Sequence, residues 1–228
     1  MSILRIEDLN IEVTKKKVKY IYLRICHANG EVKVSAPRYS SLDSIRIFVL
    51  SKLPWIKEQQ IKVKNRKREI QLDFVSNEIH YFDGKSYALN IIEKAGRTNV
   101  TLKDNIMEMY IRPGTDRAKR KLLVERLYRK HLKDSVPYYI QKWEPVMNVK
   151  VNFFNVKRMR TKWGTCNIRE KRIWFSLELA KKPAHLLEYV VVHEMVHLLE
   201  RNHSKRFYGF MNEFLPGWRH MKEELNKR

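Results

Sequence analysis

The chain has 228 residues, of which 43% are hydrophobic and 11% aromatic, a composition that predicts a folded core and excludes a disordered or fibrous protein. Lys and Arg number 47 against 25 Asp and Glu, and the formal net charge of +22 predicts either a surface that attracts polyanions or simply a very soluble basic protein. No apolar stretch approaches the length that spans a bilayer, so we expect no membrane-spanning helix.

Short strands are the first elements expected along the chain. Apolar and polar residues alternate over residues 11–13 and 19–25, with the period of a half-buried strand. Ala28-Asn29-Gly30 is a turn signal, and a partner strand is expected over residues 31–36. Together these segments predict a β-hairpin.

A helix is expected from residue 41 to about residue 67, because apolar residues recur there at helical spacing. Ser41 can cap its start, and Pro54 is expected to kink or split it. The basic cluster of residues 62–68 closes the stretch. It is a solvated helix end or, alternatively, a contact for a polyanion.

Four more strands are expected over residues 79–82, 86–93, 99–103 and 106–112. Turn signals, Asp83-Gly84 and Asp104-Asn105, lie between the first pair and between the second pair. A cluster of helix and strand breakers follows at residues 112–115. We therefore expect a strand-rich N-terminal region over residues 1–114 and a second domain over residues 115–228.

The second domain is expected to open with a long helix over residues 116–143, disturbed at Pro137. Three strands are then expected over residues 149–156, 157–165 and 171–175. Pro183 suits the first position of a further helix, in which an apolar run leads into the pattern His193-Glu194-Met195-Val196-His197.

This pattern places two histidines four residues apart, one above the other on one helix face, so that His193 and His197 can bind one metal ion. Glu194 lies beside them and can take a proton from a metal-bound water without binding the metal itself. The alternative is a pair of ordinary buried histidines with an exposed glutamate. The apolar surroundings favour the metal, because unpaired His and Glu side chains would cost free energy there.

A catalytic zinc ion needs a third protein ligand and an open fourth position. His203 is the first candidate, but a straight helix would point it away from His193, so the helix must end between them. Asn202 can end the helix in the left-handed conformation, and Ser204 can cap the next one. Glu213, one helix later, is the rival ligand.

Residues 193–207, HEMVHLLERNHSKRF, resemble the signature of the YgjP-like metallopeptidases, zincin-fold relatives of the SprT-like proteases. The segment RTKWGTC at residues 160–166 resembles the same family's Trp-Gly motif. The resemblance implies one zinc ion per chain bound by His193, His197 and His203, with Glu194 as general base. The resemblance implies only a poorly defined substrate class, and the substrate we expect is a peptide or protein.

On this interpretation an extended substrate would lie against a sheet edge formed by residues 153–166, where Gly164 permits close backbone approach. Trp163 is either an anchor of the core or a substrate contact. Arg160, Lys162 and Tyr208 are the candidates for stabilising the oxyanion, although Arg160 and Lys162 also fit a solvated strand face.

The expected fold is α+β, with a strand-rich N-terminal part and a zincin-like domain made of a small sheet, the metal-binding helix and a closing helix. The expected function is that of a zinc metallopeptidase. Two alternatives stand beside it. One is a zinc protein that binds nucleic acid through its basic surface, or a protease that cleaves DNA-bound proteins; the other is a hydrolase of non-peptide amides. The two distant cysteines, Cys26 and Cys166, and the lack of a signal-peptide pattern in residues 1–10 favour a soluble cytoplasmic protein, and nothing indicates an oligomeric state.

Overall fold

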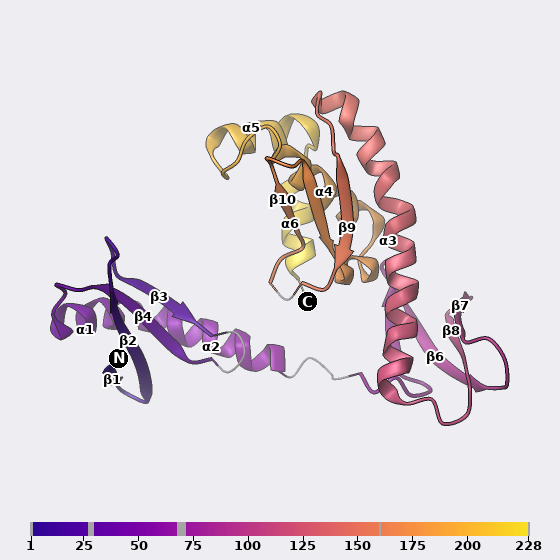
Figure 1. The fold of residues 1–228 in the computed structure, drawn as a ribbon, viewed down its shortest axis with the longest axis horizontal. Helices are drawn as coiled ribbons and strands as arrows, with labels where there is room; N and C mark the ends of the chain where they lie inside the picture. The colour runs from indigo at the N-terminus through magenta and orange to yellow at the C-terminus, as the bar shows by residue number, and fades with distance from the viewer. Residues whose placement is uncertain (1, 27–29, 68–71, 160, 228) are drawn as a thin grey trace. The chain divides into compact units, whose positions relative to one another are not determined.

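The computed structural model describes residues 2–26, 30–67, 72–159 and 161–227 (Figure 1). The chain forms two compact units, Met1–Gln71 (unit 1) and Leu72–Arg228 (unit 2). The boundary expected at residue 114 lies inside unit 2, in the turn that leads into a long helix. The fold mixes helices and sheets, which confirms the α+β fold class expected from the sequence.

Unit 1 contains a four-stranded sheet in the order β1-β2-β4-β3. The pairing of β3 with β4 is antiparallel, which confirms the expected hairpin, although Ala28 and Asn29 of its turn lie outside the described residues. The first strand was not expected, and it pairs antiparallel with the second. The strands are β1 (Ser2–Ile6), β2 (Leu9–Lys16), β3 (Tyr22–Ile25) and β4 (Val32–Pro37).

The helical stretch of unit 1 divides into α1 (Leu42–Ser51) and α2 (Leu53–Lys67). Ser41 caps α1 as expected, since its Oγ accepts a hydrogen bond of 3.1 Å from the Ser44 backbone N–H. The break lies at Lys52, and Pro54 sits in the first turn of α2, where a missing N–H costs no helical hydrogen bond. The side chains of the basic cluster at residues 62–68 lie outside the described part.

Unit 2 begins with a second four-stranded sheet, in the order β5-β6-β8-β7. Both expected hairpins are confirmed, because β5 pairs antiparallel with β6 and β7 with β8, while β6 and β8 run parallel. The strands are β5 (Ile79–Phe82), β6 (Lys85–Glu93), β7 (Asn99–Lys103) and β8 (Ile106–Ile111).

The long helix α3 (Arg117–Met147) contacts both β7 and β9 (Phe153–Lys157), a strand of the further sheet in unit 2. Asp116 caps it by accepting a hydrogen bond of 2.8 Å from the Lys119 backbone N–H. The helix continues through Pro137, where we expected a disturbance, and through Pro145. Its buried face joins the side chains of both sheets in one core, which is why residue 114 does not separate two cores.

The third sheet has the order β10-β11-β9. β9 (Phe153–Lys157) runs parallel to β11 (Arg172–Ser176), and β10 (Gly164–Asn167) pairs antiparallel with β11 at an edge. The strand expected over residues 157–165 is therefore wrong for most of its length, because the described residues between β9 and β10 are not extended in a ladder.

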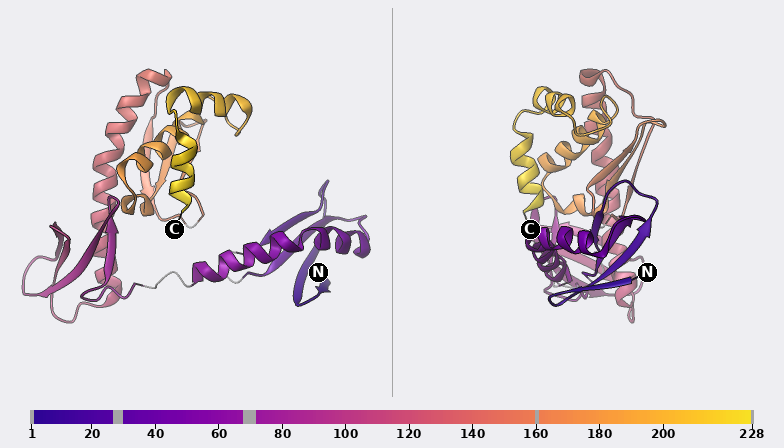
Figure 2. Two further views of the ribbon diagram at one scale, coloured as in Figure 1. Left: turned by 180° about the vertical axis from the view of Figure 1, so that it is seen from behind. Right: turned by 90° about the vertical axis from the view of Figure 1, so that its left-hand side faces the viewer.

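The short helix η1 (Leu177–Lys181) leads into α4 (Ala184–Val196), which is followed by α5 (Lys205–Phe214) and α6 (Trp218–Asn226). α4 contacts α3, α5, α6 and β10, as the two further views also show (Figure 2). Because these neighbours bury most of α4, the run Tyr189–Val192 before His193 is apolar on all its faces.

The β5–β6 turn is fastened to the entrance of α4. The backbone N–H groups of Asp83 and Gly84 donate to the carbonyls of Ala180 and Lys181, over 2.8 and 3.2 Å. A Cβ on Gly84 would lie 2.7 Å from Cγ of Pro183, and φ of this glycine is +77°. Only glycine fits this contact, so the hairpin fixes where α4 begins.

Across the described residues, no helix combines the length and the apolar character that crossing a membrane requires.

His80 on β5 makes the stability of unit 2 depend on pH. This side chain is 1% exposed, and burial lowers its pKa from 6.5, opposed by the Glu78 carboxylate 3.1 Å from its Nε2. The unfolded chain therefore binds the proton first, and the free energy of unfolding should fall as the pH drops below 6.5, by at most ~1.4 kcal/mol per pH unit.

We expect His80→Gln, which retains a donor for Glu78 but does not titrate, to flatten this dependence. Urea unfolding at pH 7.5 and pH 5.5 measures the slope. His220→Gln, at an exposed position of α6, controls for the loss of a histidine. Equal slopes in the wild type and in His80→Gln would contradict the prediction.

Candidate metal centre and active-site cleft

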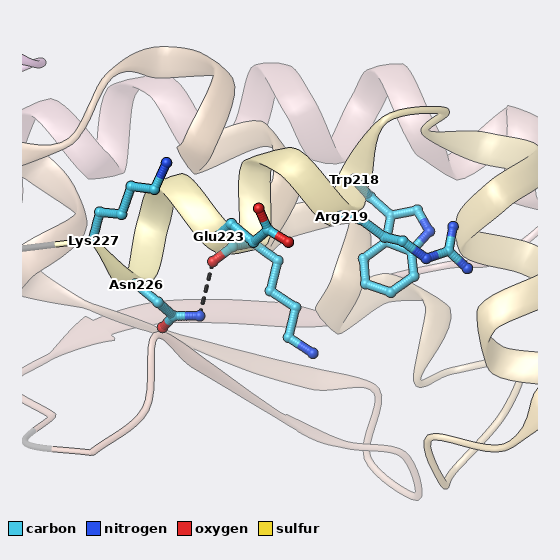
Figure 3. Close-up of a pocket in the computed structure, with 6 residues that line it drawn as sticks. Trp218, Arg219, Glu223, Asn226 and Lys227 are labelled. Carbon is cyan, nitrogen blue, oxygen red and sulfur yellow. Dashed lines mark hydrogen bonds between the residues drawn. The ribbon is translucent and has the colours of Figure 1, made fainter.

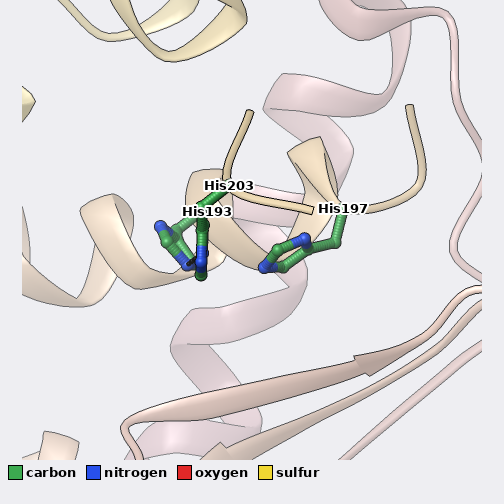
Figure 4. Close-up of side chains that lie close together, drawn as sticks. All are labelled: His193, His197 and His203. Atoms are coloured by element: carbon green, nitrogen blue, oxygen red, sulfur yellow. Dashed lines mark hydrogen bonds between the residues drawn. The ribbon is translucent and has the colours of Figure 1, made fainter. Parts of the chain in front are cut away.

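Three histidine side chains converge in unit 2 (Figure 4). His193 projects from the last turn of α4, His197 from the residue that caps its C-terminus, and His203 approaches from the loop that follows. Their ligand atoms all lie within 4.8 Å of one another, and Nε2 of His193 is 3.1 Å from Nε2 of His203. The spacing along the helix thus produces the expected convergence.

The chain turns sharply after α4 to bring His203 back. The last turn tightens, since Leu198 and Leu199 donate backbone hydrogen bonds to the carbonyls three residues earlier, each over 2.9 Å. Asn202 does not have the positive φ that we expected of it. Ser204 caps α5 as expected, accepting from the Phe207 backbone N–H over 3.3 Å.

The tautomer of His197 follows from its backbone contact. Its Nδ1 lies 3.2 Å from the Glu200 carbonyl oxygen, which can only accept, so Nδ1 carries the hydrogen and Nε2 offers a lone pair. Burial, with the neighbouring histidines, lowers the pKa of His193 to about 3, which keeps that imidazole neutral. Neutral imidazoles with free lone pairs are the form that binds metals.

The donor set fits a transition metal with nitrogen ligands. Zn–N bonds of about 2.0–2.1 Å in a tetrahedral site place two ligand nitrogens about 3.3 Å apart, close to the separation of the His193 and His203 Nε2 atoms. Phe207 supports all three rings from one side, with ring centroids 5.0, 4.8 and 4.7 Å from those of His193, His197 and His203. The buried phenyl ring restrains the imidazoles before any ion binds.

Glu194 lies beside the three histidines and is 5% exposed. Burial raises the pKa of its carboxyl to about 8, while the Lys162 charge acts in the opposite direction. Its side chain lies against Gly164 of β10: a Cβ there would be 2.6 Å from Glu194 Cγ and Oε1. The close approach expected of Gly164 is thus made by the glutamate.

The histidines and Glu194 line a cleft of about 1280 Å³. Three of the candidate substrate contacts, Lys162, Trp163 and Gly164, also line it. Trp163 is half-buried and packs against the core as well as lining the cleft, so its place is compatible with both an anchor of the core and a substrate contact. Arg160 lies outside the described residues.

Two candidates lie elsewhere. Tyr208 is not among the residues that line the cleft; its ring stacks between His203 and Trp218, with centroids 6.2 and 5.4 Å away. Glu213, the rival ligand, is exposed on α5 and does not belong to the histidine group.

Cys166 is a free thiol that lines the cleft, and burial, with the Glu194 charge, raises its pKa to about 12.

Several cleft residues were not anticipated. Tyr189 lies one helical turn before His193, with ring centroids 5.9 Å apart, and burial with the Glu194 charge raises its pKa to about 12. The spacing of four residues was a signal for Tyr189. Lys222 comes from α6, and nothing local in the sequence marks it or the supporting role of Phe207.

Comparisons with known proteins give the following similarities. The sequence model of the family described as "YgjP-like, metallopeptidase domain" matches residues 19–228. Among solved structures, the chain is similar to the metallopeptidase zymogen abylysin of Pyrococcus abyssi, with 13% identity, a TM-score of 0.37, and coverage of 40% of this chain and 90% of that one. It is also similar to the zymogen jannalysin of Methanocaldococcus jannaschii, with 18% identity, a TM-score of 0.34, and coverage of 41% and 92%. No curated protein matches the chain.

Proposed function

The chain belongs to the YgjP-like metallopeptidase family, and from this membership and the geometry of the cleft we propose that it hydrolyses peptide bonds with one zinc ion and Glu194 as general base. The observation that carries the proposal is the convergence of three imidazoles within 4.8 Å beside a buried carboxyl. Three protein ligands with one open position are the pattern of a catalytic zinc site.

His193, His197 and His203 would hold the metal. Imidazole nitrogens suit zinc, and the lack of a thiolate in the group argues against a structural site of the zinc-finger kind. When bound there, zinc supplies Lewis-acid chemistry, polarising the scissile carbonyl and acidifying water.

Glu194 moves the protons. Its carboxylate accepts a proton from the attacking water and delivers it to the leaving amine. The pKa of about 8 describes the site without a metal, and a nearby dication would lower it, leaving the carboxylate ionised at neutral pH. Because the Glu194 side chain lies directly against the Gly164 backbone, its carboxylate has little freedom to leave the reacting position.

The edge strand β10 would hold the substrate. Gly164, Thr165, Cys166 and Asn167 all line the cleft, and β10 has a neighbour in the sheet on one side only. An extended peptide can add to such an edge by backbone hydrogen bonds, which present its amide group to the centre.

Metal content per chain is the first test. Elemental analysis of the wild-type protein, purified without added metal, should find about one zinc per chain. In His203→Ala the zinc content should fall sharply, because two imidazoles alone hold the ion weakly. Glu213→Ala and His220→Ala are the matched controls and should retain the metal.

Zinc retained in His203→Ala but lost in Glu213→Ala would move the third ligand to α5. A wild-type protein that binds no zinc even after reconstitution would overturn the proposed function.

A further inference from the structure

The charged residues on the rim of the cleft are all cations. Lys162 precedes β10, Arg169 lies in the β10–β11 turn, Arg201 lies in the α4–α5 loop, and Lys222 projects from α6. All four are exposed, and the one acidic residue lining the cleft, Glu194, is buried. Since the chain has 25 acidic against 47 basic residues, four charged positions chosen at random would on average include an acid.

None of these cations forms an ion pair with another described residue. Elsewhere in unit 2 exposed cations do find partners, such as Lys142 with Glu188 over 2.7 Å and Arg172 with Glu170 over 2.9 Å. The rim therefore presents uncompensated positive charge from four different elements that surround the centre. Cleft walls of one sign concentrate ligands of the opposite sign.

All four cations line the same cleft as the three histidines and Glu194. The positive charge of the rim therefore lies around the position where a scissile bond would be held. Acidic side chains on either side of that bond would meet these cations.

A neighbouring hollow on α6 is also lined by more cations than acids. This second hollow, of about 570 Å³, shares Lys222 and Asn226 with the cleft and adds Arg219, Lys227, Trp218 and one acid, Glu223 (Figure 3). Arg219 lies over the Trp218 ring, 4.7 Å from its centroid, which holds the guanidinium beside the groove. Residues of a substrate further from the scissile bond that follow this hollow would meet three cations and one acid.

We propose that the cleft selects acidic peptide segments, with Asp or Glu side chains near the scissile bond bound by Lys162, Arg169, Arg201 and Lys222. The inference rests on the proposed function and names its substrate class. A single-stranded nucleic acid fits less well, because it needs aromatic faces on which bases stack. Apart from the histidines, the aromatic residues that line the cleft are Tyr189 and Trp163. Tyr189 is 5% exposed, and Trp163 is half-buried because it packs against the core, so neither offers an open ring face for a base.

The test uses three peptides with blocked termini and one shared central sequence. The residues that flank this sequence are Asp and Glu in the acidic peptide, Asn and Gln in its amide analogue, and Lys in the basic peptide. Blocked termini exclude a contribution from a free C-terminal carboxylate. Binding is measured by fluorescence anisotropy on zinc-loaded Glu194→Gln, and cleavage on the zinc-loaded wild type. Each exposed contact contributes roughly 1.4- to 5-fold, so the acidic peptide should be preferred over its amide analogue about tenfold at low salt.

Lys222→Glu should reduce this preference at least about fivefold, and raising the salt to 0.5 M should weaken it in the wild type. The matched control is Lys133→Glu, an exposed position of α3 outside the cleft, which changes the net charge equally. Lys222→Arg should keep the preference, and melting temperatures confirm that each variant folds.

Equal binding of the three peptides, or equal effects of Lys222→Glu and Lys133→Glu, would overturn the inference while cleavage still supports the proposed function. Acid-selective binding without any cleavage would overturn the proposed function and support the inference. Tighter binding of single-stranded DNA than of the acidic peptide, weakened by Lys222→Glu, would assign the cations to nucleic acid and overturn the inference.

Discussion

Glu194→Gln is expected to lower kcat/KM by roughly 10²–10⁴, the contribution of a positioned general base. Gln has the same size and fits beside Gly164, but it cannot accept the proton of the attacking water. Since Glu194 is not one of the three converging ligands, the zinc content should remain that of the wild type. Elemental analysis and peptide hydrolysis on the same preparation separate the two effects.

The stability of Glu194→Gln should not fall, because a neutral amide removes the cost of ionising a carboxyl that is 5% exposed. Glu200→Gln, a change of the same kind on the loop after α4, controls for the chemistry of the substitution. Wild-type activity in Glu194→Gln would contradict the assignment of the base, whatever the metal content.

Gly164→Ala is expected to lower kcat/KM by about 10², although Gly164 supplies neither a metal ligand nor a proton acceptor. The new Cβ would lie 2.6 Å from Cγ and Oε1 of Glu194 and 2.8 Å from Cδ, so something must move. α4 is packed against α3, α5, α6 and β10, whereas the Glu194 carboxylate borders the cleft, so we expect the carboxylate to be the group that is displaced. We expect a loss of roughly 1–3 kcal/mol in stability from the overpacking, with zinc retained.

The double variant decides whether Gly164 acts through Glu194. If it does, Gly164→Ala added to Glu194→Gln should cost little further activity, because the base is already absent. Gly209→Ala is the matched control: this glycine lies on α5 with no atom within 4 Å of its added Cβ, and alanine there should stabilise the helix slightly. Fully additive losses in the double variant would contradict the positioning role.

The parts of the site that could be predicted from the sequence are those set by local geometry. His193 and His197 lie on one face because four residues make about one helical turn. His203 needed only a helix end before it, which the chain supplies with a tight turn at Leu198 and Leu199. Phe207 and Lys222 could not be predicted, because their places depend on how α5 and α6 pack on α4.

The fold shows the same division. Asp83-Gly84 and Asp104-Asn105 predicted two hairpins correctly, since such turns are determined by the residues in them. The boundary at residue 114 rested on a local breaker cluster, and contacts distant in sequence decide how the chain divides. Likewise β10 starts at Gly164, where pairing with Phe175 begins, and no local change of pattern marks that point.

The contact of Gly84 with Pro183 limits how the enzyme can be shortened. A fragment beginning at residue 115 would keep all three histidines but lose the turn that fastens η1 and the start of α4. It would also lack Met107 and Met109, which are fully buried in the same core as the apolar face of α3. The smallest piece of the chain suited to crystallisation, or to grafting the metal centre onto another protein, therefore begins near Leu72.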